Sequence, residues 1–198
     1  MFEICAGAFL TQNTAWTNVE KALAALHGAG LLGPREMASC PLPRLERAIR
    51  SSGYFRQKAR RLREFCRRVL RDHPEGMEKW FARADAPGLR AELLSYRGVG
   101  PETADSMVLY AAGKPSFVID AYTRRIGGRA GLARGLSYDG WKALFEAALP
   151  PDVKVYNEYH ALLVKLGKDF CKKGSPSCGR CPLGRICGKL IESRGPGR

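Results

Sequence analysis

Four cysteines lie close together near the C-terminus, and their thiols restrict how this part of the chain can fold. Cys171, Cys178, Cys181 and Cys187 are spaced C-x6-C-x2-C-x5-C. Only the middle pair has the two-residue spacing of a zinc half-site, and no His lies among the four, so a zinc ribbon built from two short Cys pairs fits poorly. Four thiolates also suit an iron–sulfur cluster, whose irons are bound by Cys sulfur. The spacing therefore favours a cluster, with structural zinc as the alternative.

The other cysteines and the N-terminal segment bear on the compartment. Cys5, Cys40 and Cys66 are scattered among apolar or helical residues, and seven is an odd count for a set of disulfides. This distribution predicts a reducing compartment. No basic region precedes the N-terminal apolar residues, and no apolar stretch approaches the roughly 20 residues needed to span a bilayer. We expect a cytoplasmic protein that does not enter a membrane.

The charge balance indicates the kind of partner. The chain of 198 residues carries a formal net charge of +14, and 45% of its residues are hydrophobic. This hydrophobic content predicts a globular protein, and the length allows one good core or two small ones. A strong positive charge is typical of proteins that bind polyanions such as nucleic acid, although solvated Lys and Arg side chains are a common alternative.

Much of this charge lies in residues 56–71, where apolar residues such as Leu62 and Phe65 recur at helical spacing. The pattern predicts a helix with one packed face and a cationic remainder. Only Glu64 and Asp72 oppose the cations, which favours a surface that faces phosphates over a neutral solvated one. The cations of this segment are Arg56, Lys58, Arg60, Arg61, Arg63, Arg67, Arg68 and Arg71.

Helix signals run along the chain, whereas strand patterns are nearly absent. Capping residues, glycines and prolines mark where one helix ends and the next begins. The sequence therefore predicts an all-α fold. The expected helices span 15–27, 45–49, 89–96, 102–112, 141–149 and 156–166.

A short glycine turn joins two of these helices. Gly98 and Gly100 flank Val99 and permit a positive φ and a close backbone approach, and Pro101 begins the next helix, where its missing N–H costs nothing. Backbone amides and the helix dipole then point outward together, and a phosphate oxygen is their natural ligand, while Val99 packs inward. Taken alone, a G-x-G sequence is more often an ordinary helix–helix turn.

Asp120 lies twenty residues after Gly100, between an apolar run and a basic helix. As a helix N-cap, its carboxylate would accept backbone N–H bonds. These bonds and the nearby arginines would keep the carboxylate ionised, so that it could also face a developing positive charge. Capping and catalysis are therefore compatible roles for this residue.

The glycine turn, the Asp about twenty residues later and the cysteine loop together resemble the endonuclease III superfamily. These proteins are DNA glycosylases in which a helix-hairpin-helix is followed by a Gly/Pro-rich segment and a catalytic Asp. The resemblance runs from about Phe2 to Cys187 in the order and spacing of the family. Three motifs in this order are far more specific than any one of them.

The resemblance implies a two-domain fold with a DNA-binding cleft between the domains. A helical barrel would occupy residues 1–114, with the helix-hairpin-helix at about 89–112. Residues 115–198 would carry the catalytic Asp and a [4Fe-4S] cluster on the loop 171–187. The family usually has a helix before the segment that begins at Phe2, and a shortened N-terminus would weaken the cluster domain.

The resemblance also implies base excision repair, in which a damaged base is flipped out of double-stranded DNA and its N-glycosidic bond is hydrolysed. Asp120 would stabilise the oxocarbenium-like sugar and orient or deprotonate the attacking group. Bifunctional members place a nucleophilic Lys where this chain has Glu102, so we expect water as the nucleophile. Glu102 would also suit a helix N-terminus as a simple acid. A bifunctional lyase that uses another amine, such as Lys114 or Lys168, and a non-catalytic lesion-binding module are the alternatives.

Further residues match positions of the family that lie at the DNA. Gln12 stands where a Gln fills the space left by the flipped base, and Trp16 stands where the 3-methyladenine-type branch has an aromatic residue that stacks on that base. Stacking suits an electron-poor base, although a Trp at a helix start is more often part of the core. Tyr122 replaces a His of several members. The other expected DNA contacts are Lys58, Arg97, Gly98, Val99, Gly100, Thr103 and Arg125.

The excised base stays open at this stage, with an alkylated purine and a deaminated or oxidised pyrimidine as candidates. We expect a monomer associated with the nucleoid.

Overall fold

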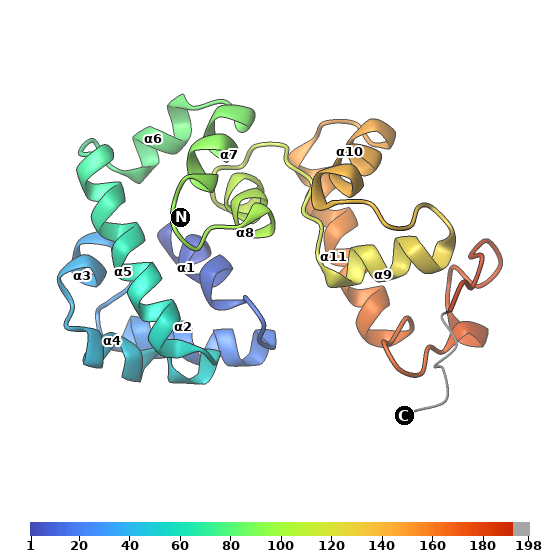
Figure 1. The fold of residues 1–198 in the computed structure, drawn as a ribbon, viewed down its shortest axis with the longest axis horizontal. Coiled ribbons are helices and arrows are strands. Elements are labelled where there is room, and N and C mark those ends of the chain that lie inside the picture. Colours follow the sequence, from blue (N-terminus) through green and yellow to red (C-terminus); the bar gives the residue numbers. More distant parts are fainter. Residues whose placement is uncertain (192–198) are drawn as a thin grey trace. The chain divides into compact units, whose positions relative to one another are not determined.

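The computed structural model describes residues 1–191, and within them every regular element is a helix (Figure 1). The all-α prediction is therefore confirmed. The chain forms two compact units, Met1–Ser116 and Phe117–Arg198. The elements of the first unit are α1 (Phe2–Leu10), α2 (Trp16–Gly28), α3 (Pro34–Ser39), α4 (Leu42–Ala48), the 3-10 helix η1 (Arg50–Ser52), α5 (Phe55–Asp72), α6 (Met77–Arg83), α7 (Ala86–Leu94), α8 (Pro101–Ser106) and the π-helix η2 (Met107–Ala111).

Helix α1 lies at the centre of the first unit, packed against α2, α5, α8 and η2. Most of its side chains are buried, because all of its residues except Glu3 are apolar or small. Phe9 of α1 meets Phe65 of α5, with 5.1 Å between the ring centroids. Burial raises the pKa of the Cys5 thiol to about 12 and also raises that of Cys66, so both thiols stay protonated and unreactive.

Helix α5 has the two faces that its sequence predicts. Leu62, Phe65, Cys66 and Val69 are buried against α1, α3 and α4, whereas most of its arginines reach the surface. Two arginines also fasten neighbouring segments. Arg67 donates to the carbonyl of Ala38, and Arg68 donates to the carbonyl and hydroxyl of Ser95.

Three helices of the first unit, α1, α3 and α6, are absent from the predicted set. Helix α1 is apolar on nearly every side, so its sequence shows no helical period. Helices α3 and α6 are short. Each has fewer than eight residues, so neither presents enough turns for a 3.6-residue period to be recognised. The helix expected at 102–112 is regular only as far as Ser106, and the chain then widens into η2. Met107, Val108 and Leu109 are all buried, and three consecutive apolar residues suit an α-turn and a π-turn equally.

The second unit contains α9 (Ala121–Ala130), α10 (Tyr138–Ala148), α11 (Val153–Asp169) and the 3-10 helix η3 (Cys178–Arg180). Helices α9 and α11 pack side by side (Figure 1). Phe117 stacks on Phe145 at 4.7 Å between ring centroids, and this contact holds the segment before α9 against α10. Gly127 lets α9 approach Trp141, because a Cβ there would lie 2.7 Å from the indole ring.

Candidate functional site

The Asp120 carboxylate caps α9, as its sequence context predicts. Oδ1 accepts hydrogen bonds from the backbone N–H of Thr123 at 2.7 Å and from the Thr123 hydroxyl at 2.9 Å. The backbone of Asp120 is extended, which is the usual conformation of an N-cap residue. The local sequence Asp-Ala-Tyr-Thr therefore fixes one carboxylate oxygen at the start of the helix.

His160 of α11 faces the other oxygen of this carboxylate, with 3.6 Å between Nε2 and Oδ2 of Asp120. Burial of the Asp120 carboxyl raises its pKa, but the interaction with His160 and the hydrogen bonds from Thr123 outweigh this effect, and the pKa lies below its usual value. His160 was not among the residues singled out from the sequence. It lies forty residues from Asp120 on another helix, and no motif links the two positions.

The glycine turn between α7 and α8 is held by Gln12, from the loop that follows α1. Its Nε2 donates to the carbonyl of Gly98 at 3.0 Å and to Oγ1 of Thr103 at 3.0 Å. Gln12 is half-buried and Thr103 is buried. These bonds bring the predicted wedge residue and the predicted hairpin residues together within the first unit.

The two glycines of this turn differ in conformation. Gly98 has φ 87°, and a Cβ on it would lie 2.6 Å from Cδ of Arg61, so the position requires glycine. Gly100 has φ −92°, and a Cβ there would meet nothing within 4 Å. Both glycines permit a positive φ, and of the two Gly98 adopts one. Val99 is buried, as expected.

Lys58 differs from its expected place beside a DNA groove. Its side chain is 4% exposed, and Nζ donates to the carbonyl of Leu10 at 2.8 Å and to that of Ser52 at 2.6 Å. Burial lowers the pKa of this ammonium group. The sequence pattern predicted that Lys58 is one of the solvent-facing cations of α5. In the structure, Lys58 instead lies on the packed face of the helix, beside Ala59 and Leu62. The structure gives it a role in joining α1, η1 and α5.

Three other side chains of the first unit are largely exposed. Trp16, at the start of α2, is 49% exposed, so it is not the core residue that its helix position most often indicates. The Arg97 side chain is 80% exposed and forms a distant ion pair with Glu64 at 3.9 Å. Tyr54, which the sequence did not single out, is 72% exposed and has φ 45° just before α5. Non-glycine residues in this conformation are uncommon and often occur at functional sites.

The structure also shows the positions of two other predicted site residues, Glu102 and Arg125. Glu102 lies in the first turn of α8 and is exposed, which is a favourable place for an acid on a helix N-terminus. Arg125 of α9 donates from Nε to the carbonyl of Cys171 at 2.8 Å, and its guanidinium lies 4.9 Å from the centroid of the Tyr122 ring. Arg125 thus joins α9 to the cysteine loop inside the second unit.

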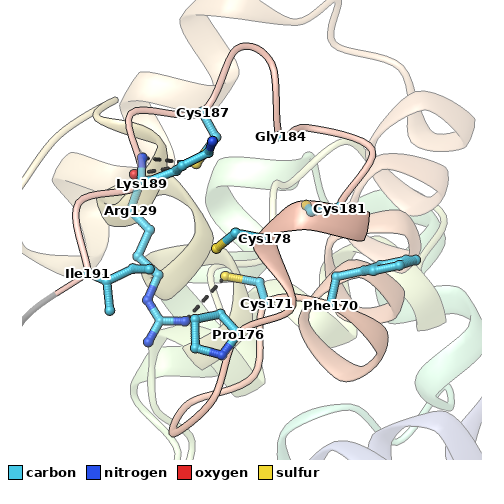
Figure 2. A pocket seen from close by; sticks show the side chains of 10 residues that line it. All are labelled: Arg129, Phe170, Cys171, Pro176, Cys178, Cys181, Gly184, Cys187, Lys189 and Ile191. Carbon is cyan, nitrogen blue, oxygen red and sulfur yellow. Dashed lines mark hydrogen bonds between the residues drawn. The ribbon is translucent and has the colours of Figure 1, made fainter.

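The four C-terminal cysteines line one pocket (Figure 2), and all are free thiols. The side chains of Cys171 and Cys178 extend in the same direction in this view. Within residues 1–191, no group of three or more His, Cys, Asp or Glu side chains is close enough to hold a metal ion as the side chains stand. A Cβ on Gly184 would lie 2.9 Å from the carbonyl oxygen of Cys178. An all-sulfur donor set folded tightly around a common space fits an iron–sulfur cluster in chemistry.

Basic groups border this pocket. Arg129 donates from Nη1 to the carbonyl of Lys172 at 2.7 Å and lies 3.4 Å from Sγ of Cys171. The backbone N–H of Lys189 lies 3.4 Å from Sγ of Cys187 (Figure 2). Elsewhere in the described part of the chain, no helix is long and apolar enough to cross a membrane.

Comparison with protein families gives a match over residues 6–151 to the model of the "HhH-GPD superfamily base excision DNA repair protein". A putative DNA repair glycosylase of Methanocaldococcus jannaschii is 41% identical over 187 residues, which cover 94% of this chain and 84% of the relative. Endonuclease III of Thermotoga maritima is 29% identical over 196 residues, which cover 99% of this chain and 86% of that protein.

Solved structures agree with these sequence relatives. An endonuclease III in a non-covalent complex with DNA superposes with a TM-score of 0.81 at 28% identity, covering 95% of this chain and 83% of that one. The 3-methyladenine DNA glycosylase of H. pylori, bound to 1,N6-ethenoadenine, superposes with a TM-score of 0.76 at 26% identity, covering 84% of each chain.

Proposed function

The chain belongs to the HhH-GPD superfamily of base excision DNA repair proteins, and we propose that, as a DNA glycosylase of this family, it hydrolyses the N-glycosidic bond with water as the nucleophile. The observation that carries the proposal is Glu102 at the start of α8, where the bifunctional members have their nucleophilic lysine. A carboxylate cannot form a Schiff base with the sugar, so strand cleavage by β-elimination is not a main activity of this chain.

Asp120 is the catalytic residue in this proposal. As the bond between C1′ and the base nitrogen breaks, its electron pair leaves with the base, and positive charge develops on the sugar. A carboxylate whose pKa is held below its usual value is ionised at neutral pH and stabilises that charge. A water oxygen then bonds to C1′, and the proton of that water passes to Asp120.

The first unit is the DNA-binding barrel in this proposal. The backbone amides at the turn between α7 and α8 meet a phosphate, and Arg97 adds an exposed charge beside them. Gln12, hydrogen-bonded to that turn, fills the space left by the flipped nucleotide. Trp16 offers an exposed π-face on which the extruded base stacks.

The preferred substrate in this proposal is an alkylated, electron-poor purine. An electron-poor ring stacks well on indole, and Trp16 leaves its side chain half-exposed. The H. pylori relative is a 3-methyladenine DNA glycosylase bound to 1,N6-ethenoadenine. The net charge of +14 supports binding to double-stranded DNA, which for this chain would occur as a cytoplasmic, nucleoid-associated monomer.

We also propose that the second unit binds a [4Fe-4S] cluster through Cys171, Cys178, Cys181 and Cys187. The cluster would brace the loop that follows α11, and hydrolysis of an N-glycosidic bond requires no electron from it. Iron and sulfide content of protein purified without oxygen tests this assignment. Four irons per chain, lost in Cys178→Ser, would support the cluster, whereas one zinc per chain would replace it with a structural zinc site.

The test of the function is base release from duplexes that carry 3-methyladenine, uracil, thymine glycol or 8-oxoguanine, with and without alkali. We expect release of 3-methyladenine and strand breaks only after alkali. Asp120→Asn should abolish release. Asp152→Asn is a matched control, because Asp152 caps α11 by accepting from the N–H of Val155 and an Asn can cap in both places.

Strand breaks without alkali, trapped as a covalent adduct by borohydride, would overturn the water mechanism and reveal an amine nucleophile. Tight binding to a damaged duplex without release of any base would instead make the chain a lesion-binding module.

A further inference from the structure

The two oxygens of the Asp120 carboxylate have different surroundings. Oδ1 accepts from both the N–H and the hydroxyl of Thr123. Neither bond uses Oδ2, which faces Nε2 of His160 at 3.6 Å. Oδ1 is therefore committed to the cap of α9, and Oδ2 is the oxygen whose lone pairs can meet a reacting water.

His160 is held on a rigid part of the second unit. Helices α9 and α11 approach closely at Gly167, where a Cβ would lie 2.2 Å from the Tyr122 ring, and Arg125 donates to the carbonyl of Gly167. The side chains of His160 and Asp120 are 14% and 13% exposed. An interaction between two largely buried groups is stronger than the same interaction in water, and packing on two helices limits how far either group can move.

We propose that His160 is a positioning residue, which directs its Nε2–H toward Oδ2 of Asp120 and thereby keeps this oxygen ionised and aimed at the attacking water. The inference rests on the proposed function of Asp120 as the catalytic carboxylate. The neutral tautomer with its proton on Nε2 is sufficient for this role, because Nε2 is the ring nitrogen that faces Oδ2.

Among the neighbours of the Asp120 carboxylate, His160 is the side chain from another helix that lowers its pKa. The groups that face Asp120 are Thr123 from α9 and His160 from α11. The neighbouring cations of α9 are directed elsewhere, since Arg124 lies over the Tyr138 ring and Arg125 donates to Cys171 and Gly167. Burial alone would raise the pKa of Asp120, so removal of His160 should move the acidic limb of the rate profile to higher pH.

The test compares His160→Leu, which keeps bulk without a donor, with His160→Gln, which keeps a neutral N–H at similar reach. His27 lies exposed in the last turn of α2, and His27→Gln is the matched control. Single-turnover base release is measured across pH on the damaged duplex that the native enzyme turns over. Binding is measured on a duplex with a tetrahydrofuran abasic site.

We expect His160→Leu to slow base release by about 10- to 100-fold with unchanged binding, and its acidic limb to move to higher pH. His160→Gln should recover most of the rate, and His27→Gln should match the native enzyme. A uniform loss in both His160 variants with an unmoved acidic limb would reduce His160 to a packing residue and overturn the inference.

A second measurement does not depend on turnover. The 13Cγ signal of Asp120, assigned by its absence in Asp120→Asn, is titrated in the native protein and in both His160 variants. A higher midpoint in His160→Leu than in the native protein supports the inference, and identical midpoints overturn it. If the midpoints differ but the native protein releases no base from any duplex, the proposed function fails and the role of His160 in catalysis fails with it, while its control over Asp120 ionisation stands.

Discussion

Nζ of Lys58 lies 2.8 Å from the carbonyl oxygen of Leu10, the last residue of α1, although Lys58 belongs to the most cationic helix of the chain. A helix end leaves its last carbonyls without partners inside the helix, and a buried carbonyl without a partner is destabilising. The ammonium group of Lys58 satisfies this carbonyl and that of Ser52 at once.

Lys58→Met should therefore affect stability and not DNA binding. We expect the free energy of unfolding to fall by about 1–3 kcal/mol, because two buried carbonyls lose their donor. Urea unfolding followed by circular dichroism measures this change. A variant with native stability and a smaller salt dependence of DNA binding would return Lys58 to the DNA surface.

Arg97→Ala should give the opposite result. Its guanidinium is exposed, and an ion pair as long as that with Glu64 adds little to stability. We expect weaker binding to every duplex, with the slope of log K against log salt smaller by about one. Arg47→Ala, which removes an exposed charge from α4, is the control for net charge alone. Equal slopes for the two variants would show that Arg97 has no phosphate contact of its own.

The contrast between Lys58 and Arg97 shows which features of the structure could be predicted from the sequence. Composition and helical period predicted the all-α fold and the two faces of α5, because both depend on local spacing. They could not show that Lys58 falls just inside the packed face, since its neighbours in space are the ends of α1 and η1. Which residues lie on a face near its edge is decided by tertiary packing.

The surroundings of Asp120 show the same limit. Its capping role was predicted, because an N-cap and its N–H donors lie within four residues. His160 was missed, because its contact depends on how α9 packs on α11. A lone His in an amphipathic helix carries no local sign of such a partner.

Trp16 should matter for the base and little for the fold. The side chain is half-exposed, so Trp16→Leu should lower the free energy of unfolding by less than about 1 kcal/mol. Loss of stacking should slow release of 3-methyladenine by about tenfold or more, in line with about 1–3 kcal/mol for a stacked base. Trp16→Phe should retain most of the rate. Equal release by all three proteins would remove Trp16 from the base pocket.

Stability should depend on pH through Asp120. Its pKa is lower in the folded protein than in the unfolded chain, so its ionised form stabilises the fold. This contribution is complete above the usual carboxyl pKa and is lost as the pH falls through the lowered folded-state value. The difference in unfolding free energy between the native protein and Asp120→Asn should shrink across that interval. Urea unfolding at a series of pH values measures it, and a difference that does not change with pH would contradict the assignment.

The two glycines of the turn before α8 give a matched pair of variants. Gly98→Ala places a Cβ 2.6 Å from Cδ of Arg61 and imposes φ 87° on a residue that avoids it, whereas Gly100→Ala meets open space at φ −92°. We expect Gly98→Ala to destabilise by about 1–3 kcal/mol and to weaken DNA binding, because the turn must deform and its carbonyl loses the bond from Gln12.

Gly100→Ala should cost less than about 1 kcal/mol, which is the usual difference between Gly and Ala at an N-cap. Its effect on DNA then depends on how closely a phosphate approaches the backbone. Native stability with lost binding would mean that a phosphate approaches closer at Gly100 than a methyl group permits. Native binding as well would limit the need for glycine to Gly98, where the strained φ and the contact with Arg61 coincide.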